Sequence, residues 1–235
     1  MALLFTGCTH AQPAPSASSS SAALDFTEPG VARSMVQRLM AKAASDKALM
    51  VEISASTVQV TVPGKVAPVS WAYRNGEIAE VASDLQDVGQ SQFTTSEFNL
   101  ADVGALFRAA AGQSGSSQDQ SLTIVGTEAS TTGDVQMSVS TVPESRTIFF
   151  TPSGGLLEIL DFDTPGGLKR GIADAIGGRG LIYSLTVIST QGAWSEFPGT
   201  NNTTLRRTRS AKVPAITTVR SAASNPPLFS SSRVD

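Results

Sequence analysis

Cysteine and histidine are almost absent from this sequence, which holds one of each, Cys8 and His10, among 235 residues. A disulfide needs two cysteines, and a structural zinc site needs about four cysteine or histidine ligands. We therefore expect neither a disulfide scaffold nor a zinc module. Catalysis through a Ser-His-Asp arrangement needs a histidine in the folded part, but His10 lies in a tract that we expect to be unfolded. This catalytic class is nearly excluded.

Charged residues and long apolar runs are also scarce. Lys, Arg, Asp and Glu make up 16% of the chain, and no uncharged apolar run reaches the roughly 20 residues that a membrane-spanning helix needs. The glycine-rich stretch at residues 177–180 follows a predicted helix, whereas phosphate-binding loops follow a strand and open a helix. We predict no membrane span, no cofactor, no metal site and no catalytic residue.

The first eight residues, MALLFTGC, form an apolar stretch that ends at the single cysteine. They resemble the lipobox of bacterial lipoproteins, in which an apolar residue and two small residues precede a cysteine that becomes lipidated; Phe5 stands where leucine is usual. The resemblance implies a lipid anchor at Cys8, on the extracytoplasmic side of the bacterial cell envelope. Seven residues are too few for a signal peptide. Either the true start codon lies upstream, or the match is accidental.

Two segments lack the pattern of a folded domain. Residues 9–24 form a Ser/Ala/Pro tract without charge or periodicity, which cannot bury enough apolar surface to fold. Lipoproteins commonly place such a tether after the lipidated cysteine. The carboxyl-terminal residues 221–235 are predicted to be disordered.

Between these ends the sequence repeats itself. Residues 25–30 (DFTEPG) and 161–166 (DFDTPG) share Asp-Phe at the start and Pro-Gly at the end, and residues 97–102 (EFNLAD) hold a comparable place. The pattern predicts three repeats, at 25–96, 97–160 and 161–220. The alternative is a single β-rich domain that happens to contain three helices.

Each repeat is predicted to begin with a helix and to continue as an antiparallel β-meander. Apolar residues recur at helical spacing from Val31 to Ala43, from Val103 to Ala110 and from Leu168 to Ile176. Thr27, Asn99 and Thr164 are the candidate N-caps of these helices. The predicted fold class is therefore α+β, with three tandem helix-plus-meander repeats and the helices packed on one face of the sheet.

Strand patterns follow each predicted helix. In the first repeat they cover 49–53, 57–62, 69–73 and 77–81, and Asn75-Gly76 between the last two is a strong hairpin signal. In the second they cover 122–125 and 135–142, and 147–150 is expected to pair with 156–160 across a turn. The third repeat offers 181–189, 193–197, 205–209 and 213–219.

A helix followed by a short antiparallel sheet, with the hairpin YRNGEI at residues 73–78, looks like the PepSY-type modules and β-lactamase-inhibitor-like repeats of secreted bacterial proteins. This resemblance implies a protein that acts by binding other proteins rather than by catalysis. It assigns no functional residue.

Positive charge gathers near the carboxyl end. Residues 165–235 carry a formal charge of +6 and residues 1–164 carry −9. The candidate binding patch consists of Arg206, Arg207, Arg209 and Lys212, which lie on or beside one predicted strand. Such a patch attracts an anionic headgroup, an acidic polymer or an acidic protein; the alternative is solvated charge that protects an edge strand from aggregation. Nucleic acid is not expected, because the chain as a whole is acidic.

The sequence thus predicts a non-enzymatic envelope lipoprotein that binds or scaffolds an unknown envelope protein or an anionic or lipid ligand. The alternative is a carrier of a lipid or other hydrophobic ligand, held in a pocket between helices and sheet. The residues expected to line such a pocket are Phe149, Phe150, Leu156, Leu157, Trp194 and Phe197.

Overall fold

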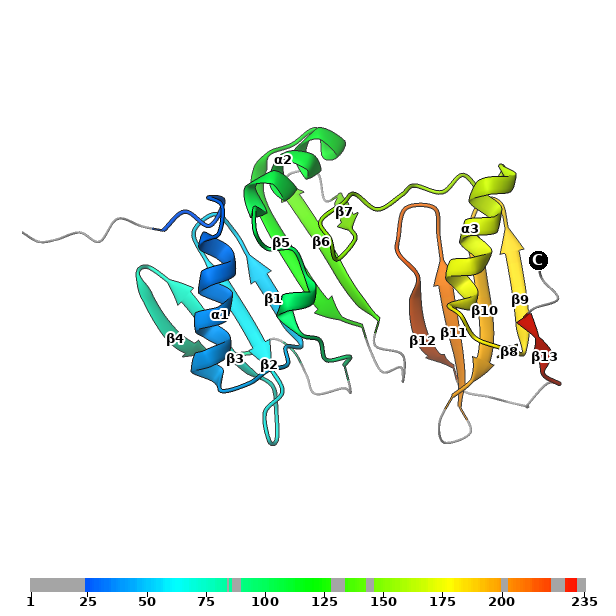
Figure 1. Cartoon of the computed structure of the whole chain (residues 1–235), viewed down its shortest axis with the longest axis horizontal. Helices are drawn as coiled ribbons and strands as arrows, with labels where there is room; N and C mark the ends of the chain where they lie inside the picture. The colour runs from blue at the N-terminus through cyan, green and yellow to red at the C-terminus, as the bar shows by residue number, and fades with distance from the viewer. Residues whose placement is uncertain are drawn as a thin grey trace, which may run out of the picture.

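A computed structural model describes residues 24–83, 85, 90–127, 134–142, 146–199, 203–220 and 227–231. Cys8, His10 and the predicted tether lie outside these residues. The described chain is α+β, with three α-helices and two main antiparallel sheets (Figure 1). In chain order its elements are α1 (Val31–Ala43), β1 (Met50–Ile53), β2 (Val58–Val62), β3 (Val69–Arg74), β4 (Glu77–Val81), η1 (Thr95–Glu97), α2 (Val103–Ser114), β5 (Gln118–Gly126), β6 (Val135–Val142), β7 (Thr147–Phe150), α3 (Pro165–Ile176), β8 (Leu181–Ile182), β9 (Ser184–Ile188), β10 (Gly192–Pro198), β11 (Thr204–Arg209), β12 (Ile216–Arg220) and β13 (Phe229–Ser230).

The larger sheet has seven strands in the order β4-β3-β2-β1-β5-β6-β7. Two meanders, β1 to β4 and β5 to β7, join where β1 pairs antiparallel with β5, so that Val51 lies opposite Ile124. Successive side chains of a strand point to opposite faces, and one face carries an apolar row that runs from strand to strand. Helices α1 and α2 pack on this face in one shared core. Both lie in front of the sheet in Figure 1.

The core of the larger sheet is filled. Phe26, at the entry to α1, is fully buried and meets Tyr73 edge-on, with 5.4 Å between ring centroids. The opposite face of the sheet carries small and polar side chains, such as Thr61 and Ser70, whose buried hydroxyls lie 2.7 Å apart. The hairpin predicted at Asn75-Gly76 is confirmed as the two-residue turn between β3 and β4.

The helix starts agree only in part with the predicted caps. Thr164 caps α3 as predicted, with its hydroxyl accepting from the backbone N–H of Gly167. Thr27 does not cap α1, because its hydroxyl bonds to Asp25 and the helix begins only after Gly30. For α2 the cap is Asp102 in place of the predicted Asn99.

The smaller sheet has the order β12-β11-β10-β9, and α3 packs across β10 and β11. A separate two-stranded pairing joins β8 to β13 through Ile182 and Phe229. The structure therefore corrects the prediction of disorder for 221–235 at Phe229–Ser230, because the backbone of β8 offers hydrogen-bonding groups that this segment satisfies. Residues 221–226 and 232–235 lie outside the described part of the chain.

Candidate binding site

The four residues of the predicted basic patch lie in three different environments. Arg207 and Arg209 are two positions apart on β11 and face α3, whereas Arg206 points to the opposite face of the sheet. Lys212 lies in the loop between β11 and β12 and is exposed. The structure therefore brings only Arg207 and Arg209 together, and both are turned inward.

Arg209 is 1% exposed and is the largest fully buried side chain among the described residues. Its Nε donates to a carboxylate oxygen of Asp174 at 3.1 Å, and Nη2 donates to the carbonyl of Glu158 at 2.8 Å. Nη1 donates to the carbonyls of Ser210 and Val213. Burial lowers the pKa of Arg209, and the hydrogen bond that Arg209 donates to Asp174 opposes that shift. A planar guanidinium with five donors suits such a convergent set of acceptors.

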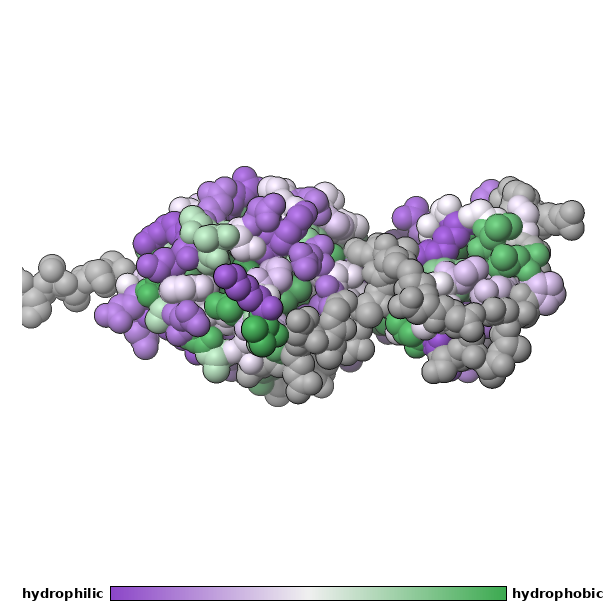
Figure 2. Space-filling model, turned by 90° about the horizontal axis from the view of Figure 1, so that it is seen from below, coloured by the Kyte–Doolittle hydropathy of each residue, from purple (hydrophilic) through white to green (hydrophobic). Residues whose placement is uncertain are grey.

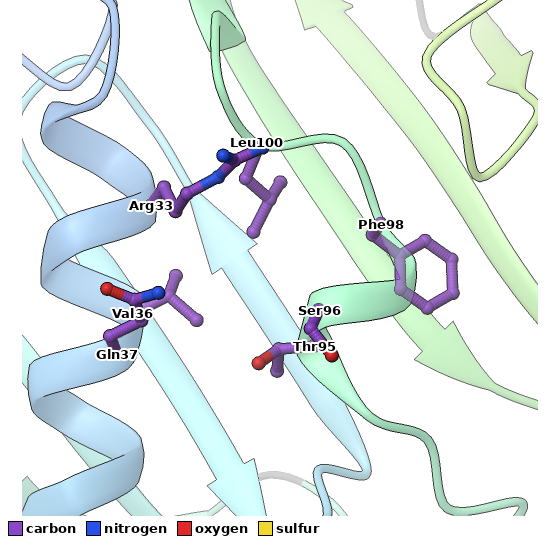
Figure 3. A pocket seen from close by; sticks show the side chains of 7 residues that line it. All are labelled: Arg33, Val36, Gln37, Thr95, Ser96, Phe98 and Leu100. Atoms are coloured by element: carbon purple, nitrogen blue, oxygen red, sulfur yellow. The ribbon is translucent and has the colours of Figure 1, made fainter.

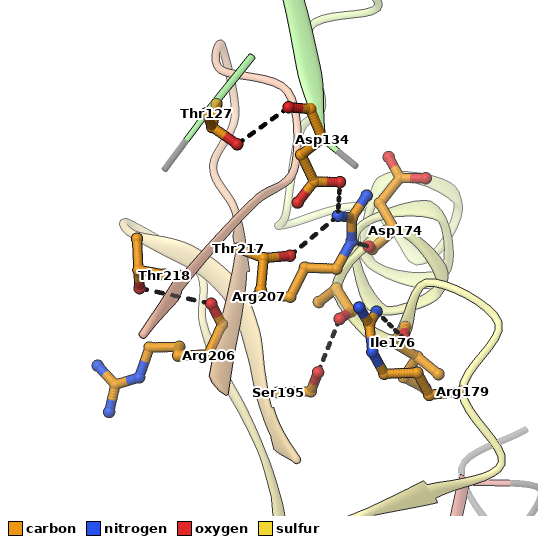
Figure 4. Close-up of polar contacts among 11 residues, drawn as sticks. Thr127, Asp134, Asp174, Ile176, Arg179, Ser195, Arg206, Arg207, Thr217 and Thr218 are labelled. Carbon is orange, nitrogen blue, oxygen red and sulfur yellow. Dashed lines mark hydrogen bonds and ion pairs between the residues drawn. The ribbon is translucent and has the colours of Figure 1, made fainter. Parts of the chain in front are cut away.

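Arg207 and its neighbours complete the end of helix α3 (Figure 4). The last carbonyls of an α-helix have no partner within the helix. Here the carbonyls of residues 174, 175 and 176 accept hydrogen bonds from Arg207 Nε at 2.8 Å, Ser195 Oγ at 2.7 Å and Arg179 Nη1 at 3.1 Å, respectively. The cationic donors also match the negative end of the helix dipole. Two of these donors come from the strands below and Arg179 comes from the chain just after α3, which fixes α3 on its sheet.

The same arginine connects the two sheets. Arg207 Nη1 forms an ion pair with Asp134, the residue just before β6 of the larger sheet, and lies 3.3 Å from the hydroxyl of Thr217. The side chains of Arg207 and Asp134 are 17% and 11% exposed, so water screens this pair only weakly. Arg179 stacks on the ring of Phe197 nearby, at 3.7 Å from guanidinium to centroid, and burial lowers its pKa.

Arg206 is also engaged, on the outer face of the smaller sheet. It donates twice to one carboxylate oxygen of Glu196, at 2.6 and 3.0 Å, and its guanidinium lies 5.6 Å from the ring of Trp194. The bond from Arg206 is the main cause that lowers the pKa of Glu196. Lys212 is thus the one member of the predicted patch that has no ion-pair partner among the described residues.

The segment that links β7 to α3 departs from the predicted hairpin. Phe150 and Leu156 form a bridge, and the N–H of Leu157 donates to the carbonyl of Phe149 at 2.9 Å. Beyond Leu157 the pairing stops, so the prediction that 156–160 pairs along the whole of 147–150 is wrong. The reason is a competing set of contacts. Arg209 binds the carbonyl of Glu158, and the N–H of residue 160 donates to the carbonyl of residue 211 in the β11–β12 loop.

This divergence opens a groove of about 400 Å³ between the last strand of the larger sheet and the linker. Its lining comes from β7, the linker, the end of α2 and the β11–β12 loop, namely Gln113, Thr147, Ile148, Phe149, Leu156, Leu157, Glu158, Ile159 and Lys212. Leu156 is 42% exposed and Ile159 is 62% exposed, so the groove presents apolar side chains from neighbouring positions of the linker to solvent. We call this feature the β7 groove.

Two smaller hollows lie elsewhere on the described surface. One of about 270 Å³ lies between α1 and η1, and its wall includes Arg33, Gln37 and Ser96 (Figure 3). The other, of about 280 Å³, follows the outer side of α3 along Leu168, Ile172 and neighbouring residues. Seen from below, polar residues cover most of the larger part of the molecule, and a patch of apolar residues is visible on the upper side of the part at right (Figure 2).

The residues predicted to line one hydrophobic pocket lie in several different places. Phe149, Leu156 and Leu157 line the β7 groove. Phe150 belongs to the core of the larger sheet, and Phe197 belongs to a small core beneath the smaller one. Sequence reasoning missed Gln113 and Ile159 as groove residues. The sequence held one signal for Ile159, because this apolar residue directly follows the charged Glu158.

Among the described residues, no group of three His, Cys, Asp or Glu side chains could hold a metal ion. None of the helices in the same residues is long and apolar enough to cross a membrane.

Replacement of Arg209 by lysine tests the role of the buried guanidinium. Lysine keeps the charge but cannot reach all four acceptors, so Arg209→Lys is expected to lower the free energy of unfolding by about 3 kcal/mol. Urea denaturation followed by circular dichroism measures the change. Arg170, which contacts the same Asp174 from a position 63% exposed, provides the control: Arg170→Lys is expected to stay within about 0.5 kcal/mol. Equal stabilities of the two variants would contradict this role.

Neither the family models, nor the curated proteins, nor the solved structures give a match to this chain. Its function is therefore inferred from its own geometry.

Proposed function

We propose that this protein is a non-enzymatic module that recognises a protein partner through the β7 groove. The observation that carries the proposal is the groove itself, an apolar surface of exposed Leu156 and Ile159. Beside it lies Lys212, which has no ion-pair partner among the described residues. Exposed apolar residues that are rimmed by polar ones mark interaction surfaces. Two positions of the predicted basic patch support the groove indirectly, because Arg209 holds its linker wall and Lys212 lies on its rim.

The alternative function, a carrier of a lipid or other hydrophobic ligand, has less support. A carrier buries most of its ligand in a concave pocket, and the expected place was the space between helices and sheet. In the larger sheet that space is filled by one continuous core, which includes Phe26, Leu39, Val103 and Phe107. The hollows found in the described residues lie at the surface, where a protein segment fits better than an enclosed acyl chain.

We also propose that the three helices and their meanders are repeats of one unit. The support is positional: Phe26, Phe98 and Phe162 precede α1, α2 and α3 in turn, and all three are at most 5% exposed. In homologous sequences these positions should stay large and apolar together. Frequent loss of one of them alone would contradict the proposal.

The proposed setting is the extracytoplasmic side of a bacterial envelope, with the protein anchored through a lipid on Cys8. Intact mass of the protein from a membrane fraction of its bacterial host measures this. The expected result is a chain that begins at Cys8 and carries acyl chains, and the acyl mass should disappear in Cys8→Ala. An unmodified wild-type chain that retains Met1 would contradict the lipid anchor.

Photocrosslinking in the same host tests recognition through the groove. A benzoyl-phenylalanine at position 159 is expected to give one discrete crosslink to another protein. The control places the same probe at Val66, which is 89% exposed and lies on the β2–β3 loop, far from β7 in the sheet order. Crosslinks only to lipid at position 159 would favour the carrier, and identical products from both positions would contradict a specific groove.

A further inference from the structure

We propose that the partner binds as an extended segment that adds a strand to the outer edge of β7, with a carboxylate facing Lys212. This inference rests on the proposed function and specifies its mode. The structural argument is that the linker pairs with the outer edge of β7 only at Leu156 and Leu157, so the rest of this edge has no strand beside it.

The outer edge of β7 offers unpaired backbone groups. The carbonyl of Phe149 points away from β6, because it accepts from Leu157 of the linker. Residues two apart on a strand point their backbone groups to the same side, so the N–H and C=O of Thr147 also face outward. Among the described residues, the N–H of Phe149 and both groups of Thr147 have no backbone partner. Leu157 already lies opposite Phe149, so a segment laid along this edge would pair with the two groups of Thr147.

The β7 groove lies beside this edge, between β7 and the linker that diverges from it. The linker begins to pair with β7 at Leu156 and Leu157 and is then drawn to the smaller sheet by Arg209. Because the linker diverges from β7 after Leu157, a wedge-shaped space remains between the two segments. The walls are lined by Ile148 on one side and Ile159 on the other. Alternate side chains of an added strand would enter between them.

The composition of β7 also distinguishes it from the far edge of the same sheet. Natural proteins protect exposed edges with charged residues. At the far edge of the same sheet β4 carries Glu77 and Glu80, whereas β7 reads Thr-Ile-Phe-Phe and has no charge within it. β-branched and aromatic residues favour strand pairing. An unprotected edge of this composition is suited to accept a strand.

The positive charge of Lys212 indicates which charge the partner segment carries. Lys212 lies on the rim of the groove and has no ion-pair partner among the described residues. An ammonium at this place complements a carboxylate of the incoming segment. The occupant that fits is therefore a protein segment in extended conformation, with alternating apolar residues and an acidic residue near Lys212.

A library of random 12-residue peptides displayed on phage, selected on the wild-type chain, supplies the probe. Alternating apolar residues with Asp or Glu are expected to be enriched. The most enriched peptide is then synthesised with a fluorophore, and its Kd is measured by anisotropy. Failure to enrich any such pattern would contradict the inference.

Variants of β7 separate strand addition from other modes. Thr147→Pro removes the outward N–H, and proline is tolerated where the N–H of an edge strand faces solvent. It is expected to weaken binding at least about fivefold, the value of one hydrogen bond, while Thr147→Val keeps the N–H and the wild-type affinity. If Thr147→Pro fails to fold, N-methylation of alternate peptide residues is expected to give the same loss. Lys212→Glu should also weaken binding, and Lys169→Glu on α3 should not.

The outcomes distinguish this inference from the proposed function. A peptide that binds wild type and Thr147→Pro equally, and tolerates N-methylation, would overturn strand addition but leave protein recognition intact. Lipid crosslinks at position 159 would overturn the proposed function itself.

Discussion

The buried guanidinium of Arg209 is the contact on which the architecture around the groove depends. It binds helix α3 through Asp174, the β11–β12 loop through Ser210 and Val213, and the linker through Glu158. Arg209 thus joins the loop that follows it to two segments that lie 35 and 51 residues away in the chain. An unpaired buried charge is costly, so the four acceptors must stay in place together. This requirement fixes the path of the linker between the two sheets.

The groove follows from that path. A linker free of Arg209 could continue its pairing along β7 and close the edge of the larger sheet. Because Glu158 is held by the smaller sheet, pairing ends at Leu157, and the edge stays open beside Ile159. The ion pair of Arg207 with Asp134 acts in the same direction, since it connects β11 to the residue before β6. Contacts made by the smaller sheet therefore shape the groove beside the larger one.

Local pattern was sufficient to predict much of the fold, and non-local contacts explain the rest. The apolar spacing from Val31 to Ala43 predicted α1, and Asn75-Gly76 predicted the β3–β4 turn. The alternation of Arg207 and Arg209 already placed both on one face of a strand, but the sequence does not show that this face lies beneath a helix. The hairpin after β7 failed for a similar reason, because its competitor lies 51 residues away in the chain.

The candidate site was therefore only partly predictable. Phe149, Leu156 and Leu157 were expected in a pocket and line the groove, yet the groove lies at a sheet edge because the space beneath α1 and α2 is filled. The central claim is that the outer edge of β7 is open. Residue-resolved amide hydrogen exchange tests it most directly. Slow exchange is predicted at Ile148 and Phe150, which face β6, and fast exchange at Thr147 and Phe149. Equal protection of all four amides would contradict the account.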